Sequence, residues 1–320
     1  MTCSRRIPAV LLAAVLSLLP LSASWGETPD RSAPRSDGGS CARANFRVVL
    51  DVGHTADSPG AISARGINEY DFNLQLARKI ERTLVDAGFA KTVLMITGGP
   101  GVRSMYERVA RANNMSADLL LSIHHDSVPN PFLEKWEYDG KPAIFSDRFK
   151  GHSIFVSHEN INPKASLLFG HLLGDQLKAR GMHYTPHYTE KFMGRYQREL
   201  LDAAAGVYRY DTLFVLKKTH MPAVLLEAGS IINRDEEFLL GIPEHQAQIS
   251  AAVADAVESF CVAQSSKQTP QVAQSPKRAP QVAQSARRSR VSHARTRHLA
   301  KQTAEAVPTT ASGPPGVDMR

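Results

Sequence analysis

Cysteine is scarce in this chain, and its positions exclude one common class of hydrolase. The sequence has 3 cysteines in 320 residues, and Cys3 lies in an N-terminal segment that we expect to be removed. Cys41 and Cys261 lie at the two ends of the segment that we expect to fold. No G-x-S-x-G motif occurs either, so the sequence indicates neither a cysteine nor a serine nucleophile.

Long apolar runs are absent after the first residues of the chain. Arg5 and Arg6 precede an apolar run over residues 7–21, and small residues follow, which is typical of a secretory signal peptide over residues 1–26. An uncleaved anchor is the alternative, but the run is short and interrupted by proline. No other segment approaches the length of a membrane span, so we expect an exported, periplasmic protein that is not an integral membrane protein.

An excess of positive charge is missing from most of the chain and is found only at its end. Residues 262–320 hold ten lysines and arginines against two acidic residues, whereas the preceding residues hold 28 against 29. The near-neutral part therefore carries no signature of a nucleic-acid partner. The basic part repeats VAQS every ten residues and has almost no large apolar side chains, so we expect a disordered tail. Two interpretations of such a tail remain open: it binds an anionic envelope surface, or it only keeps the protein in solution.

Between these ends, short apolar runs alternate with amphipathic segments. Residues 27–45 indicate a polar linker, and residues 46–261 predict a single α/β domain. We expect a mostly parallel or mixed central sheet flanked by helices on both faces. Residues 128–150 and 182–211 do not fit the alternation, and we expect them to be loops next to the functional site of the domain. The predicted strands are 46–52, 91–97, 118–124, 152–158, 213–218 and 223–229, and the predicted helices are 69–87, 103–115, 165–181 and 246–260.

The two cysteines that remain after export bracket this domain. Cys41 precedes its first predicted strand, and Cys261 ends its last predicted helix. In an oxidising compartment this arrangement favours a disulfide that ties the two ends of the domain together. Two unrelated free thiols are the alternative.

Four ionisable residues fall where predicted strands end or a predicted helix begins. His54, His124 and Glu227 end or follow apolar strands, whose carboxyl ends gather at one edge of such a sheet, and Glu69 begins a helix. Two imidazoles and a carboxylate form a ligand set of catalytic zinc, and a second carboxylate accepts the proton of the attacking water. Glu227 follows AVLL in a buried strand, where an unpaired carboxylate is costly. These residues predict a zinc hydrolase.

Five motifs, which occur in a fixed order, carry a resemblance to a known family. They are LDVGH (50–54), GINEYDFN (66–73), ERVARAN (107–113), ADLLLSIHHD (117–126) and MPAVLLEAGSIIN (221–233). With them the chain resembles the zinc-dependent N-acetylmuramoyl-L-alanine amidases typified by bacterial cell-separation amidases, over about residues 47–260.

The resemblance implies an activity, a substrate and a role for each of the four residues. His54, Glu69 and His124 would be the zinc ligands, and Glu227 the catalytic carboxylate. The substrate would be peptidoglycan, cut at the amide bond between N-acetylmuramic acid and L-alanine during cell-wall remodelling or cell separation. A zinc peptidase that cuts the stem peptide and a non-catalytic wall-binding protein are the alternatives. The sequence leaves open whether an activator protein moves a loop, for which residues 128–150 are the first candidate.

Overall fold

The computed structural model describes residues 40–268. The expected signal peptide (1–26), residues 27–39 of the expected linker (27–45) and the tail beyond residue 268 lie outside the described residues. Within residues 40–268, no helix is both long enough and apolar enough to cross a membrane.

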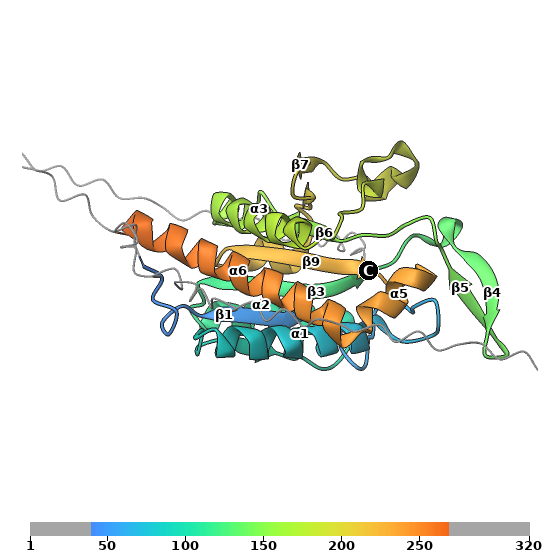
Figure 1. Cartoon of the computed structure of the whole chain (residues 1–320), viewed down its shortest axis with the longest axis horizontal. Coiled ribbons are helices and arrows are strands. Elements are labelled where there is room, and N and C mark those ends of the chain that lie inside the picture. Colours follow the sequence, from blue (N-terminus) through green and yellow to red (C-terminus); the bar gives the residue numbers. More distant parts are fainter. Residues whose placement is uncertain (1–39, 269–320) are drawn as a thin grey trace, which may run out of the picture. The chain divides into compact units, whose positions relative to one another are not determined.

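A mixed sheet of seven strands forms the centre of the domain (Figure 1). The strands are β1 (Val48–Val52), β2 (Val93–Met95), β3 (Leu119–Asp126), β6 (Ser153–Val156), β7 (Leu200–Asp202), β8 (Val207–Arg209) and β9 (Ala223–Ser230). Their order in the sheet is β2-β1-β3-β9-β6-β8-β7. The four neighbours β2, β1, β3 and β9 are parallel, β6 is antiparallel to β9 and parallel to β8, and β7 is antiparallel to β8. The prediction of a mixed α/β sheet is therefore confirmed.

Helices cover both faces of this sheet. The helices are α1 (Glu69–Asp86), α2 (Gly101–Asn114), α3 (Pro163–Ala179), α4 (Phe214–Lys218), α5 (Arg234–Leu240) and α6 (Pro243–Gln268). Figure 1 shows α1, α3 and α6 together over one face, where they pack with alternate strand residues such as Leu50 and Leu121. The intervening residues, such as Val49 and Leu120, pack towards α2 and α4 on the other face. Burial on both faces explains why β1 and β3 have nearly continuous apolar sequences.

The segments outside this alternation were expected to be loops, and they contain short regular elements. Residues 128–150 include a two-stranded hairpin, which projects beyond the sheet in Figure 1. Residues 182–211 supply β7, β8 and two short 3₁₀ helices. The bounds are β4 (Glu134–Tyr138) and β5 (Lys141–Phe145), with η1 (Asn130–Phe132), η2 (His187–Thr189) and η3 (Lys191–Tyr196).

Two sequence predictions about element type and extent were wrong. Residues 213–218 were predicted to be a strand, but they include helix α4, which buries Val215 and Leu216 and packs near α2. An apolar run this short does not distinguish a strand from a buried helical turn. The tail was expected to begin at residue 262, but α6 continues to Gln268.

The disulfide between Cys41 and Cys261 is present, with the two Cα atoms 5.3 Å apart. It joins the segment before β1 to α6 across a sequence separation of 220 residues. In the chain-entropy model, closing a loop of this length stabilises the folded state by about 5 kcal/mol. Close by, the Arg43 guanidinium forms an ion pair of 2.6 Å with Glu258 on α6.

Candidate metal centre and catalytic cleft

His54 lies just beyond the carboxyl end of β1, in a tight turn of the backbone. Its φ of 64° places it in the left-handed region, which costs a non-glycine residue about 1–2 kcal/mol. The preceding residue is Gly53, where a Cβ atom would lie 2.4 Å from Nε2 of His124. Only glycine at position 53 therefore lets the His124 ring lie so close to this turn.

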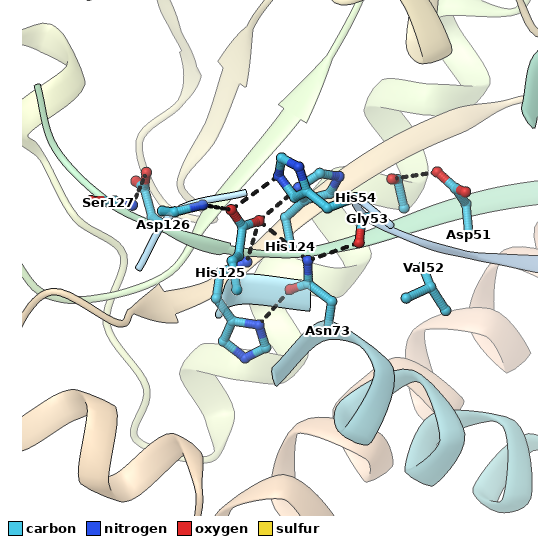
Figure 2. Close-up of polar contacts among 12 residues, drawn as sticks. Asp51, Val52, Gly53, His54, Asn73, His124, His125, Asp126 and Ser127 are labelled. Carbon is cyan, nitrogen blue, oxygen red and sulfur yellow. Dashed lines mark hydrogen bonds and ion pairs between the residues drawn. The ribbon is translucent and has the colours of Figure 1, made fainter. Parts of the chain in front are cut away.

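Glu69 is the first residue of α1, and its side chain lies between the two histidines. Its Oε2 is 3.0 Å from Nε2 of His54, and its Oε1 is 3.0 Å from Nδ1 of His124. One nitrogen from each ring and one carboxylate oxygen all lie within 4.8 Å of one another. Figure 2 shows the His54 and His124 rings close together at the centre of the site. The structure thus brings together the three residues predicted to bind the metal.

Several donors fix the Glu69 carboxylate in this position. The backbone N–H of Ala61 donates to Oε2 over 3.1 Å, and Nδ2 of Asn73, one turn along α1, donates to Oε1 over 3.2 Å. Since the Asn73 amide also donates to the Gly53 carbonyl, its own oxygen is left to accept a hydrogen bond from Nδ1 of His125 over 2.8 Å. Figure 2 shows this chain from His125 through Asn73 to Gly53. It ties the start of α1 to the ends of both β1 and β3.

The protonation states favoured by this site are those that bind cations. Burial raises the pKa of Glu69, but the adjacent His54 and His124 rings outweigh it, so the pKa lies well below its ordinary value. Burial lowers the pKa of His124, against the effect of Glu69, and lowers the pKa of His125 to about 3. A carboxylate at Glu69 and a neutral imidazole at His124 are the species that bind zinc. Two imidazoles and one carboxylate around a single point fit a zinc ion and leave a further position for a reactant.

Arg108 on α2 supports the His54 turn from the other face of the sheet. Its side chain is 3% exposed, and its Nη1 donates to Oδ1 of Asp51 over 3.0 Å and to the Val52 carbonyl over 2.6 Å. Its Nη2 donates to the His54 carbonyl. The other Asp51 oxygen accepts a hydrogen bond of 2.8 Å from the Ser122 hydroxyl on β3, the strand that carries His124. Through this network, α2 fixes the relative positions of both histidine-bearing strands.

Glu227 lies on β9, next to His124 in the sheet. The parallel register pairs these two residues directly, so their side chains project from the same face. Glu227 is 9% exposed, and it lines a cavity of about 650 Å³ together with His54, Glu69 and His124. All four residues selected from the sequence therefore face one cavity.

The sequence analysis missed three supporting residues. Arg108 and Asn73 were quoted within motifs, but no role was given to them. A signal existed for Arg108, because an arginine on the buried face of an amphipathic helix requires a buried partner. Gly60 was not assigned a role either, although a Cβ atom there would lie 2.5 Å from Oε2 of Glu69.

The sequence of this domain matches a family model described as N-acetylmuramoyl-L-alanine amidase over residues 48–259. The chain belongs to this family. A putative N-acetylmuramoyl-L-alanine amidase of Buchnera aphidicola is 25% identical over 214 residues, which cover 67% of this chain and 95% of that protein. The amidase AmiA of Escherichia coli is 26% identical over 225 residues, which cover 67% of this chain and 75% of AmiA.

The fold of this amidase is also that of a solved family member. The crystal structure of the N-acetylmuramyl-L-alanine amidase Ami1 from Mycobacterium smegmatis matches with a TM-score of 0.54. The match covers 71% of this chain and all of Ami1 at 20% identity, so it bears on the fold alone. Family membership and these relatives make the protein an enzyme that hydrolyses the amide bond between N-acetylmuramic acid and L-alanine in peptidoglycan.

Proposed function

We propose that this amidase binds a zinc ion through His54, Glu69 and His124 and uses Glu227 as its catalytic carboxylate. The observation that carries the proposal is the convergence of the three donor side chains within 4.8 Å, beside a cavity that Glu227 also lines. Zinc in such a site polarises a carbonyl group and lowers the pKa of water to about 7.

The position of Glu227 suits both proton transfers of amide hydrolysis. Its carboxylate projects into the cavity from the strand next to His124, so it can accept a proton from the water that attacks the lactyl carbonyl carbon. Once protonated, Glu227 can donate to the L-alanine nitrogen as the carbon–nitrogen bond breaks. The net reaction adds one water molecule and leaves a glycan strand without its stem and a peptide with a free amino group.

Digestion of purified peptidoglycan tests this assignment. We expect wild-type protein to release stem peptides that begin at L-alanine, detected by mass spectrometry, and a zinc chelator to abolish the release. Cleavage within the stem would instead identify a zinc peptidase, which is the alternative on the same scaffold. Intact peptidoglycan with and without the chelator would indicate a wall-binding protein or an enzyme that needs an activator.

A carboxylate-to-amide substitution tests the role of Glu227. Glu227→Gln keeps the shape of the side chain but cannot accept a proton, so we expect zinc binding to persist while turnover falls at least 100-fold. Glu107→Gln on the surface of α2, where the side chain is 44% exposed, is the matched control and should behave as wild type. A near wild-type rate for Glu227→Gln would show that another group moves the proton.

Export and attachment to the envelope belong to this proposal as well. Residues 1–26 would direct the enzyme across the inner membrane to the periplasm, where peptidoglycan lies. The basic residues after 262 would hold the enzyme to an anionic envelope surface through salt-sensitive attraction. Binding to isolated envelope that is unchanged when residues 262–320 are deleted would argue against attachment by the tail.

A further inference from the structure

The cavity is too small for the polymeric substrate of this enzyme. A volume of about 650 Å³ is typical of sites that enclose one drug-sized molecule. It therefore accommodates the reacting muramyl group and the first residues of the stem, whereas the neighbouring sugars of the strand must lie outside. The surface that continues from the mouth of the cavity is where those sugars would make contact.

Two apolar residues at the mouth of the cavity are also exposed to solvent. Ile62 and Ile144 both line the cavity, and they are 52% and 36% exposed. Ile144 belongs to β5 of the projecting hairpin (Figure 1). Ile62 precedes the turn that carries Arg65. Apolar surface left open beside a cavity is typical of a binding surface.

An aromatic pair on the hairpin lies close to this turn. Trp136 and Tyr138 stack with ring centroids 5.5 Å apart and an interplanar angle of 27°. The Arg65 guanidinium lies 5.8 Å from the Trp136 ring and 5.6 Å from the Tyr138 ring. Tyr138 is 42% exposed, so part of the stack faces solvent. We call Ile62, Arg65, Trp136 and Tyr138 the hairpin rim.

The hairpin rim is held in place rather than free to move away. Nε1 of Trp136 donates to the Ala64 carbonyl over 3.0 Å, and the Arg234 guanidinium lies 5.1 Å from the Trp136 ring. Arg65 itself forms a 2.5 Å ion pair with Glu237 on α5. A binding surface that is already ordered loses little conformational entropy when it binds.

We propose that the hairpin rim binds the glycan strand next to the muramic acid that is being cut. Sugar rings present C–H faces that pack on aromatic and aliphatic side chains, and hydroxyl groups that hydrogen-bond to charged ones. The rim offers both kinds of group: Ile62 lines the cavity, and Arg65, which follows in the next turn, contacts both aromatic rings. The inference goes beyond the proposed catalytic roles and rests on the cavity assigned to them.

Two substrates of different length separate this proposal from a general loss of activity. One is polymeric peptidoglycan, and the other is a single disaccharide-peptide prepared from it with a muramidase. For Tyr138→Ala, which lies outside the lining of the cavity, we expect kcat/KM on the polymer to fall about five- to tenfold. We expect kcat/KM on the short substrate to stay within twofold of wild type. Ile161→Ala is the control: it removes an apolar side chain that is 65% exposed and lies beyond the carboxyl end of β6.

Retention on insoluble peptidoglycan gives a readout that does not depend on turnover. The full chain is sedimented with the polymer in the presence of a chelator, in about 0.5 M salt, which screens attraction by the basic tail. We expect Tyr138→Ala to be retained several-fold less than the control. Unchanged retention and unchanged polymer kinetics would overturn the proposal, as would equal losses on both substrates. If wild type cleaves neither substrate, either the catalytic assignment fails or the enzyme needs an activator, and the retention assay alone decides this proposal.

Discussion

Replacing Arg108 with methionine tests the network that supports the metal site. Methionine keeps much of the apolar stem but removes a guanidinium that is 3% exposed. The substitution leaves the buried Asp51 carboxylate with the Ser122 hydroxyl but without its ion-pair partner. It also removes the hydrogen bonds that Arg108 donates to the carbonyls of Val52 and His54.

The expected loss in the free energy of unfolding is about 4 kcal/mol. Breaking one half of a buried ion pair costs about 3–5 kcal/mol, and each buried carbonyl left without a donor adds about 1 kcal/mol or more, although such terms do not add fully. Because domains are typically stable by about 5–15 kcal/mol, Arg108→Met should fold but with a much lower urea midpoint. Adding Asp51→Asn should recover part of the loss, since it removes the uncompensated charge.

Arg111→Met, on the same helix, is the matched control. The Arg111 side chain is 40% exposed and contacts Glu107 and the Ile96 carbonyl, so its loss should cost less than about 1 kcal/mol. The assay is urea unfolding of zinc-free protein, repeated with zinc. If Arg108 also orients His54, the added stability on zinc binding should be smaller in Arg108→Met than in wild type. Equal losses for the two variants would refute the reasoning on stability, and equal zinc-dependent gains would refute the role in orienting His54.

Three further predictions follow from the geometry. Gly60→Ala places a Cβ atom 2.5 Å from Oε2 of Glu69 and should weaken zinc binding at least tenfold in a chelator competition, whereas Gly66→Ala, with a similar positive φ but open space, should not. Cys41→Ala removes the disulfide and should cost about 5 kcal/mol in urea unfolding, with no further loss on adding reductant, unlike wild type. Burial lowers the pKa of His152 to about 4, so the unfolded state binds a proton first on acidification. As the pH falls from about 6.5 to 4, His152 should therefore lower the free energy of unfolding by about 1.4 kcal/mol for each pH unit. His152→Gln should reduce this slope.

The sequence alone determined which residues come together at the site, because the apolar runs indicate where the strands lie. His54 follows β1, and His124 and Glu227 lie in the carboxyl-terminal halves of β3 and β9, which are parallel and end at one edge of the sheet. The structure accordingly places all three residues, with Glu69, around one cavity. The disulfide was also predictable, because only two cysteines remained and they bracketed the folded segment. The role of each residue in catalysis stays a prediction that the digestion experiments will test.

Only the tertiary structure decided what holds the site and what borders it. The apolar run at residues 213–218 suits a strand or a helical turn equally, and packing against α2 selected the helix. Arg108 reaches the His54 turn across 54 residues of sequence, and Trp136 meets Ala64 across 72. Such contacts depend on the register and twist of distant elements. Local sequence determines which backbone a segment prefers, whereas the partner of a buried charge or an aromatic ring is fixed only when the elements pack together.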